Sequence, residues 1–216
     1  RKQLQIPMIA VTGTNGKTYT KELINTVLST HFNTICTKGN LNNHIGVPLT
    51  LLGMNSAHQI AIVEMGASHK GEIRDSVNIA TPDFGLITNV GKAHLEGFGS
   101  FEGVKETKGE LYDFIAESGK GIFYNCDSPD IVEMVSSRSF KESIAYGITC
   151  DKAEILPVTV TEPFLRLVCH KNGRSIHINS RLVGNYNADN ILAAMAVAER
   201  FGIPAEDAAK AIEGYV

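Results

Sequence analysis

The stretch IPMIAVTGTNGKT, residues 6–18, places a run of apolar and β-branched residues directly before two glycines, a lysine and a threonine. A buried strand that runs into a glycine-rich turn and then into a helix is the context that a phosphate-binding loop requires. The loop is shorter than the usual G-x-x-x-x-G-K-[ST] pattern, because Val11 stands where the first glycine is expected and Gly13 is the nearest glycine before Gly16. The stretch therefore predicts an α/β fold that binds phosphate where a strand ends.

Each residue type in this loop has a chemical use. Gly13 and Gly16 allow backbone conformations in which successive N–H groups turn inward, and the N-terminus of the following helix adds partial positive charge. Lys17 supplies an ammonium group for the terminal phosphates, and Thr18 supplies a hydroxyl for a magnesium ion. We therefore predict the nucleotide-binding residues Gly13, Thr14, Asn15, Gly16, Lys17 and Thr18. An ordinary glycine turn at the start of a helix is the alternative.

Short apolar runs alternate with amphipathic stretches over the first two thirds of the chain, which is typical of parallel strands joined by helices. The expected strands are 6–12, 33–37, 59–65, 84–90 and 121–125. From about 153 to 182 the pattern changes to β-rich runs around the hairpin signal KNGR. Helix resumes at 187–202 and stops at Gly202 and Pro204. The sequence thus predicts an α/β fold: a mostly parallel sheet with flanking helices, plus a small antiparallel β insert.

Composition limits the classes of partner. The chain has 216 residues, 43% of them hydrophobic, which is enough for one large domain with a core. A net charge of -3 does not favour nucleic acid, and no apolar run approaches the ~20 residues needed to cross a bilayer. The four cysteines have no C-x-x-C spacing, so we expect buried or idle thiols in a reduced, cytoplasmic protein.

Two side chains that can bind a metal follow neighbouring strands of the predicted sheet. Glu64 lies at the end of the third strand, and His94 follows the fourth in a glycine-flanked loop with Asn89. In open α/β sheets, ligands bind at the carboxyl ends of the strands. We expect Glu64 and His94 to converge there as magnesium ligands. The alternatives are a solvated glutamate at a strand end and a structural histidine.

Taken in order, the blocks of this chain resemble the Mur ligases. The shortened GTNGKT loop is shared by that family and the related folylpolyglutamate synthases. The other blocks are KGNLNNHIGVPLTLL (38–52), EMGASHKGEI (64–73), PDFGLITNVGKAHLEGFGS (82–100), KETKGELYDFI (105–115) and GNYNADNILAA (184–194). An ordered set of this kind is far more specific than any single motif. Within the family, the chain is most similar to the branch that adds D-alanyl-D-alanine to UDP-N-acetylmuramoyl tripeptide.

The resemblance implies an ATP-dependent amide ligase of peptidoglycan precursor synthesis. Such enzymes transfer the terminal phosphoryl group of ATP to a substrate carboxylate, and an amine then attacks the acyl phosphate. By matching motif, the implied catalytic residues are Lys17, His94 and Lys108, and the implied magnesium ligands are Thr18, Glu64, His94 and Lys108. The implied partners of the full-length enzyme are UDP-MurNAc-tripeptide and D-Ala-D-Ala.

Lys108 owes its assignment to the resemblance. Several Mur ligases carry a carbamylated lysine at this position, and carbamylation turns the cation into a carboxylate-like metal ligand. From the letters alone, Lys108 is one of the lysines on a solvated helix face, with Lys105 a near neighbour.

Two groups of asparagines complete the predicted site. The resemblance implies that Asn40, Asn42 and Asn43, in a glycine-bounded loop, touch the muramoyl substrate. It also implies that Asn187 and Asn190 flank the adenine of ATP. The alternatives are turn formation for the first group and capping of the following helix for Asn187.

The resemblance also implies domains beyond this chain. We expect residues 1–216 to be the central ATP-binding domain, without the N-terminal UDP-binding and C-terminal amino-acid-binding domains, and therefore almost inactive in ligation. Lys92 departs from the family pattern, because a small or uncharged residue is expected there. The competing hypotheses are another Mur ligase, a folylpolyglutamate synthase, and a P-loop NTPase switch without ligase activity.

Overall fold

Six parallel strands form a central sheet in the order β2-β3-β1-β4-β5-β6 in the computed structural model, which describes residues 5–91, 95–171 and 173–215. The strands are Met8–Thr12 (β1), Thr34–Cys36 (β2), Ile60–Glu64 (β3), Phe84–Ile87 (β4), Gly121–Asn125 (β5) and Ser143–Tyr146 (β6). The five predicted strands are confirmed, with shorter bounds for the first four. Strand β6 was not predicted, because SIAY is a short edge run that buries only Tyr146 fully.

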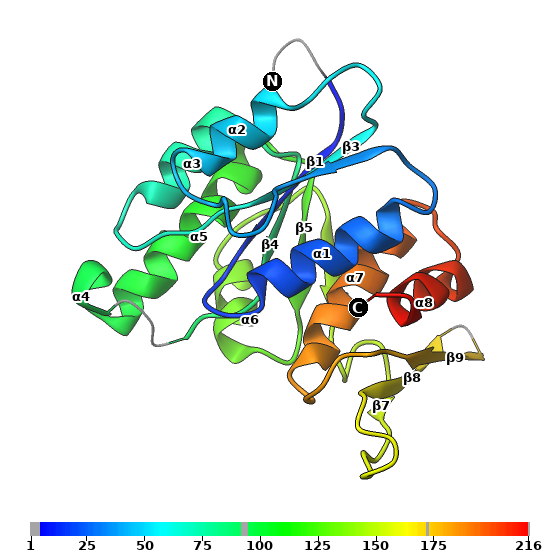
Figure 1. Ribbon diagram of the computed structural model, residues 1–216. Helices are drawn as coiled ribbons and strands as arrows, with labels where there is room; N and C mark the ends of the chain where they lie inside the picture. Colours follow the sequence, from blue (N-terminus) through cyan, green and yellow to red (C-terminus); the bar gives the residue numbers. More distant parts are fainter. Residues whose placement is uncertain (1–4, 92–94, 172, 216) are drawn as a thin grey trace.

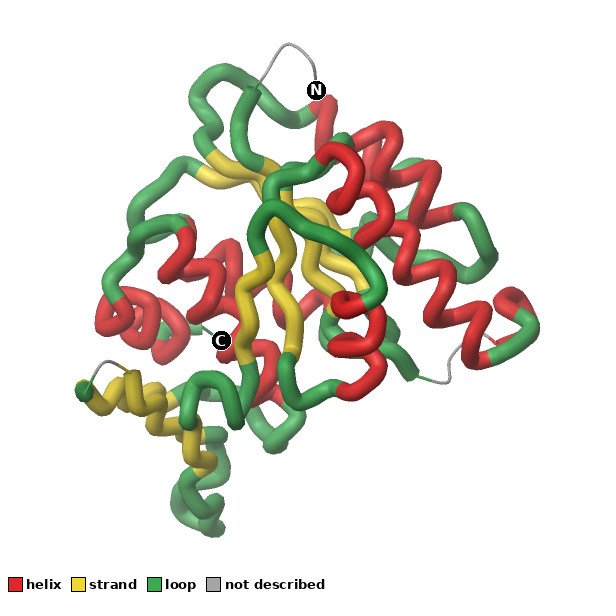
Figure 2. The backbone as a smooth tube through the Cα atoms, turned by 180° about the vertical axis from the view of Figure 1, so that it is seen from behind, coloured by secondary structure: helices red, strands yellow, loops and turns green. Residues whose placement is uncertain are grey.

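Helices cover both faces of the sheet (Figures 1 and 2). They are Lys17–Leu28 (α1), Gly46–Leu52 (α2), Glu72–Ala80 (α3), Leu95–Phe98 (α4), Phe101–Ser118 (α5), Pro129–Ser136 (α6), Asn187–Arg200 (α7) and Ala205–Glu213 (α8). Alternate residues of β1 enter two separate cores: Ile9 and Val11 join the core under α1, α7 and α8, whereas Met8 and Ala10 join the core under α3 and α5. A strand buried on both faces explains the unbroken apolar run in the sequence.

The strand order sets the position of the site. Strand β1 pairs with β3 on one side and with β4 on the other, so the chain reverses its direction of progress across the sheet at β1. Ligands of open α/β sheets bind outside the carboxyl ends of the strands at such a point. Loop 13–16 leaves β1 at this edge, at the lower side of the molecule in Figure 1.

The predicted β insert is confirmed as a three-stranded antiparallel sheet. Its strands are Ala153–Ile155 (β7), Arg166–Lys171 (β8) and Arg174–Asn179 (β9). Lys171 pairs with Arg174, so the KNGR segment closes the β8–β9 hairpin as its Asn-Gly signal indicates. Leu167 and Ile178 extend the core under α7 and α8 into the insert.

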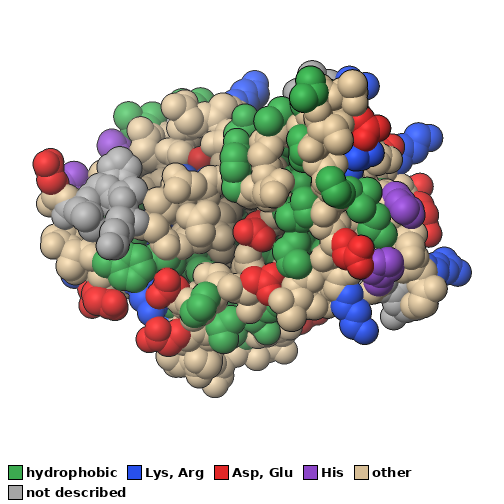
Figure 3. Space-filling view, turned by 90° about the horizontal axis from the view of Figure 1, so that it is seen from below, with side chains coloured by type: hydrophobic (Ala, Val, Ile, Leu, Met, Phe, Trp, Pro, Cys, Tyr) green, Lys and Arg blue, Asp and Glu red, His purple; other side chains and the backbone are tan. Residues whose placement is uncertain are grey.

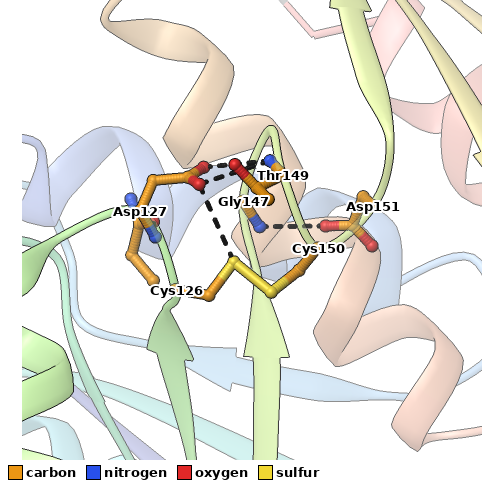
Figure 4. The surroundings of a disulfide bond; sticks show 7 residues. Cys126, Asp127, Gly147, Thr149, Cys150 and Asp151 are labelled. Atoms are coloured by element: carbon orange, nitrogen blue, oxygen red, sulfur yellow. Dashed lines mark hydrogen bonds between the residues drawn. A yellow bond between two sulfur atoms is a disulfide. The ribbon is translucent and has the colours of Figure 1, made fainter.

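A disulfide joins Cys126 to Cys150, so the expectation of idle thiols is wrong for this pair. Strands β5 and β6 are neighbours, and the loops that follow them bring the two cysteines together although 24 residues separate them. Figure 4 shows the bond between these loops, where Asp127 accepts hydrogen bonds from the Thr149 N–H. Because β6 was not predicted, this proximity was missed. Cys36 and Cys169 remain thiols, and no described helix is long and apolar enough to cross a membrane.

Candidate nucleotide-binding site

The loop between β1 and α1 has the backbone that its glycines predict. Gly13 has φ +145° and Gly16 has φ +78°, both in the region that disfavours residues with a side chain. A Cβ atom on Gly13 would lie 1.9 Å from Thr88 Oγ1, and one on Gly16 would lie 2.7 Å from Asn190 Oδ1. Glycine is therefore required at both positions for conformation and for space.

The end of β4 holds the loop in place through Asn15. The Asn15 N–H donates to Asn89 Oδ1 at 3.0 Å, and the Asn15 carbonyl accepts from Asn89 Nδ2 at 3.0 Å and from Thr88 Oγ1 at 2.6 Å. The sequence directed Asn89 to this edge but gave no indication of Thr88. A threonine directly after a buried strand, beside the predicted loop, was the available signal.

Lys17 lies over the loop itself. Its ammonium group donates to the carbonyls of Gly13 and Thr14, each at 3.0 Å. Burial lowers the pKa of Lys17, and the nearby Glu64 carboxylate opposes that shift. The amine therefore lies directly above the position at which phosphate is expected.

Glu64 connects the phosphate loop, residues 13–18, to the asparagine loop, residues 38–43. Its carboxylate is fully buried, and its Oε1 accepts from Thr18 Oγ1 at 3.2 Å and from Asn42 Nδ2 at 2.7 Å. Its Oε2 has no hydrogen-bond partner among the described residues. A buried carboxylate oxygen without a partner is costly unless something else occupies that position.

These donors suit magnesium. Mg²⁺ is usually held by one or two carboxylates, with phosphate and water oxygens completing its shell. Glu64 supplies a carboxylate oxygen that is not otherwise used, and Thr18 supplies the adjoining hydroxyl. The described residues contain no cluster of three or more His, Cys, Asp or Glu side chains that could hold a metal alone, so the remaining ligands must come from elsewhere. His94 lies outside the described residues, as does Lys92.

Lys108 lies on the buried side of α5. Only 4% of the residue is exposed, and its Nζ lies 6.0 Å from the centre of the Phe98 ring. Burial and, to a smaller extent, the charge of Lys17 lower the pKa of Lys108 to about 8. The interpretation as a solvated helix lysine is therefore wrong. A buried amine with a lowered pKa is partly neutral near physiological pH, which is the form that can react with carbon dioxide.

The three asparagines of the loop before α2 have different environments. Asn42 contacts Glu64 as described above. Asn43 Oδ1 accepts from the N–H groups of Ile45 and Gly46, so it caps α2. The exposed Asn40 uses its backbone carbonyl to bind the Asn42 N–H. The loop is therefore partly a turn, as the alternative held, and partly an extension of the Glu64 site.

A cavity of about 360 Å³ connects the loop to the phosphate site. Lys17, Asn42 and Asn43 line it together with His44 and with residues of the EMGASHKGEI block and α3. Those further lining residues are His44, Gly66, Ala67, Ser68, Glu72, Asp75 and Ser76. A larger cavity of about 560 Å³ lies between the β insert and helices α7 and α8, and it shares no lining residue with this one.

Asn187 and Asn190 connect α7 to the phosphate loop. Asn190 Oδ1 accepts from Thr20 Oγ1 at 2.9 Å, and Asn190 Nδ2 donates to Asn187 Oδ1 at 2.9 Å. Asn187 Nδ2 binds the Val183 carbonyl rather than capping α7 with its side chain. Both residues are nearly buried, and they fix the start of α7 against α1.

Figure 3 views the molecule from below, toward the side on which loop 13–16 lies in Figure 1. Acidic side chains gather near the middle of this face, next to hydrophobic ones. Because this face has no broad positive patch, phosphate bound there would have to contact local cations, backbone N–H groups or metal ions.

Comparison with known proteins gives the family. The model of the Mur ligase middle domain matches residues 11–198. The UDP-N-acetylmuramoyl-tripeptide--D-alanyl-D-alanine ligase of Bacillus subtilis is 37% identical over 214 residues, which cover 99% of this chain and 45% of that protein. The Escherichia coli enzyme of the same name is 35% identical, with 94% of this chain and 45% of that protein covered. The chain thus spans less than half the length of these relatives.

Solved structures agree. MurF from Acinetobacter baumannii superposes with a TM-score of 0.84 at 32% identity, covering 100% of this chain and 47% of that one. MurF from Thermotoga maritima in complex with ADP superposes with a TM-score of 0.82 at 27% identity, covering 96% and 49%. With most of its length matched by the family model, the chain belongs to the Mur ligase family, as a middle domain.

Proposed function

We propose that this chain is the ATP-binding domain of a ligase that joins D-Ala-D-Ala to UDP-MurNAc-tripeptide through an acyl phosphate. The observation that carries the proposal is the position of Glu64, whose buried carboxylate contacts Thr18 of the phosphate loop and Asn42 of the asparagine loop. The two loops that would bind the phosphoryl donor and the acceptor therefore meet at one anion. The names of the relatives and the ADP complex of one of them support this substrate assignment.

The chain's own residues account for binding and orientation. The N–H groups of loop 13–16 and the α1 N-terminus would hold the phosphates of ATP, and the Lys17 ammonium would offset charge on the terminal phosphoryl group. Magnesium, held by Thr18 and Glu64 with His94 and a carbamylated Lys108 as further ligands, would polarise that group. Asn187 and Asn190 would border the adenine, since they lie against the start of α1. Phosphorylation turns a carboxylate oxygen into a good leaving group for the attack of the amine.

The acceptor would enter the cavity of about 360 Å³ beside Asn42 and Asn43. Asn40 is exposed on the same loop, where it would be accessible to a muramoyl group. The nucleotide sugar and the incoming dipeptide require surfaces beyond this chain, which in the family are supplied by the flanking domains. We expect the isolated chain to fold, to bind nucleotide weakly and to have little ligase turnover. Because ATP is the phosphoryl donor, we place the reaction in the cytoplasm.

The substitution Glu64→Gln tests the proposal. It keeps the shape of the side chain and removes the charge, so we expect magnesium-dependent binding of a non-hydrolysable ATP analogue to weaken. The loss should be at least about 10- to 100-fold, which is typical of groups that only support metal ligands. Titration calorimetry with and without magnesium measures this effect on the chain.

Asp75→Asn is the matched control. Asp75 is exposed and lines the same cavity, so it loses the same charge without touching Thr18. Its nucleotide affinity should stay close to that of the original chain. Equal affinities for the Glu64→Gln and Asp75→Asn variants in the presence of magnesium would refute the metal role of Glu64.

Lys108 gives a second test, through pH. The reference pKa of lysine is 10.5 and that of folded Lys108 is about 8, so between these values the unfolded chain holds a proton that the folded chain lacks. The contribution of Lys108 to the free energy of unfolding therefore rises with pH across this window. Lys108→Met should abolish this rise and stabilise the chain below about pH 8. Thermal melts over the window measure both effects.

Lys105→Met is the control, because its ion pairs act in the opposite direction. Hydrogen bonding to Glu133 raises the pKa of Lys105, and the loss of this bond should destabilise the chain at neutral pH.

A separate experiment tests carbamylation of Lys108. With ¹³C-bicarbonate, the original chain should give a carbamate NMR signal that grows with pH and is absent in Lys108→Met. The same signal in both proteins would exclude Lys108 as the modified amine.

A further inference from the structure

Lys21 is a fully buried lysine that the sequence analysis did not single out. It lies on α1, one turn after Lys17, and none of its surface is exposed. A buried ammonium group is retained only where hydrogen bonds and counter-charges offset the loss of water. The partners of Lys21 therefore show what its charge does.

Two of these partners are backbone carbonyls at the base of the asparagine loop. Lys21 Nζ donates to the Thr37 carbonyl at 2.7 Å and to the Gly39 carbonyl at 3.0 Å. Both residues lie between the end of β2 and the segment that carries Asn40, Asn42 and Asn43. One ammonium group thus attaches the helix of the phosphate loop to the start of the asparagine loop.

The third partner is the half-buried Glu22, and the fourth is the carboxylate of Glu64. Glu22 Oε1 accepts from Lys21 Nζ at 2.6 Å. Glu64 Oε2 lies 3.9 Å from the same nitrogen, which is too far for a hydrogen bond but close enough for charge attraction. Lys21 therefore offsets the charge of Glu64 without taking the oxygen that lacks a partner.

The two carboxylate oxygens of Glu64 have different surroundings. Thr18 and Asn42 both bind Oε1, and the Glu64 N–H donates to Thr37 Oγ1, next to the carbonyl that Lys21 holds. Lys21, Thr37 and Glu64 therefore hold one another in place. Oε2 is buried 3.9 Å from the Lys21 ammonium nitrogen and has no hydrogen-bond partner among the described residues.

We propose that Lys21 is a positioning residue that holds the asparagine loop, residues 38–43, against the phosphate site without occupying Glu64 Oε2. The proposal rests on the proposed function for the identity of the ligands, and on the contacts above for the role of the lysine. It predicts two effects of opposite sign. Loss of the hydrogen bonds of the ammonium group should loosen the asparagine loop. Loss of its positive charge in the same variant should leave the affinity of Glu64 for magnesium unchanged or make it tighter.

Lys21→Met tests the first effect on the chain without any ligand. Hydrogen exchange of the backbone N–H groups in residues 39–45 should accelerate by roughly 10-fold or more, the factor expected for the loss of a hydrogen bond to a charged group. Glu22→Gln is the matched control, because it removes only the surface partner, and it should leave this exchange unchanged. Unchanged exchange in Lys21→Met would overturn the proposal whether or not nucleotide binds.

The second effect separates positioning from general destabilisation. In the full-length protein, Lys21→Met should raise the KM for UDP-MurNAc-tripeptide by roughly 10-fold and leave the magnesium and ATP-analogue affinities as tight as before or tighter. Parallel weakening of nucleotide and tripeptide binding would mean that Lys21 only stabilises the fold, and would overturn the proposal. Failure of the unchanged protein to bind ATP analogue would instead refute the proposed function.

The double variant Lys21→Met/Glu64→Gln covers the case in which the single variant does not fold. It removes both charges, so no unpaired carboxylate stays buried. Compared with Glu64→Gln alone, it should show the same acceleration of exchange in residues 39–45 and the same loss of tripeptide affinity by calorimetry. Equal exchange and equal affinity in these two variants would contradict the positioning role.

Discussion

Replacing Lys17 with alanine is expected to lower the kcat of the full-length ligase by roughly 100- to 1000-fold, the loss that follows removal of one group that stabilises transition-state charge. The ammonium group lies over the phosphate loop, held by the carbonyls of Gly13 and Thr14. No other lysine or arginine lines the cavity shared with Asn42 among the described residues. Phosphate release and product formation, followed together at saturating substrate, measure the effect.

Lys70→Ala is the control for that experiment. Lys70 is an exposed lysine that pairs with the exposed Glu106 of α5, and surface pairs of this kind contribute little. Its kcat should stay within about twofold of the original value. A Lys17→Ala enzyme with comparable turnover would show that the phosphoryl charge is stabilised elsewhere, and the proposed role of the loop would fail.

Replacing Gly13 with alanine is expected to destabilise the fold. The new Cβ would lie 1.9 Å from Thr88 Oγ1, and an L side chain is strained at φ +145°. Together, strain and overpacking should cost about 3 kcal/mol. For a chain of this size, that corresponds to a fall in Tm of roughly 6–12 °C. Calorimetry measures the Tm, and nucleotide titration should show weakened binding, because Thr88 holds the Asn15 carbonyl.

Gly202→Ala separates strain from collision. Gly202 also has a positive φ, +76°, but a Cβ atom there meets no other atom within 4 Å. Its cost should therefore be about 1 kcal/mol, and it should leave nucleotide affinity unchanged because it lies beyond the end of α7. If both variants lose the same stability, the contact between Gly13 and Thr88 has no special weight.

Local patterns predicted the elements that are buried on both faces. The run at residues 6–12 and the helix stop at Gly202 follow from burial and from backbone preference, which the sequence states directly. Strand β6 was not predicted because its half-exposed residues show little hydrophobic pattern. The disulfide was not predicted either, since the pairing of β5 with β6 is what brings Cys126 near Cys150.

Side-chain partners across the site could not be read in the same way. The contact between Asn42 and Glu64 spans 22 residues, and the contact between Thr88 and Asn15 spans 73. Such side-chain contacts depend on the order of the strands in the sheet, because that order decides which distant segments become neighbours in the folded chain. Lys21 illustrates the limit: a lysine in an amphipathic helix is expected at the surface, yet here the carbonyls that end β2 bind it in the interior.

The hydrogen bonds between Asn89 and Asn15 affect how the phosphate loop discriminates between ligands. The Asn15 N–H already has an internal acceptor, so an arriving phosphate oxygen must exchange one bond for another at that position. Exchange of this kind yields a small net gain, since only the difference between two similar bonds is recovered. Under the proposed function, preference for a triphosphate over a shorter phosphate chain would then arise at the terminal phosphates, where the Lys17 ammonium and a magnesium ion would act, rather than at the Asn15 N–H.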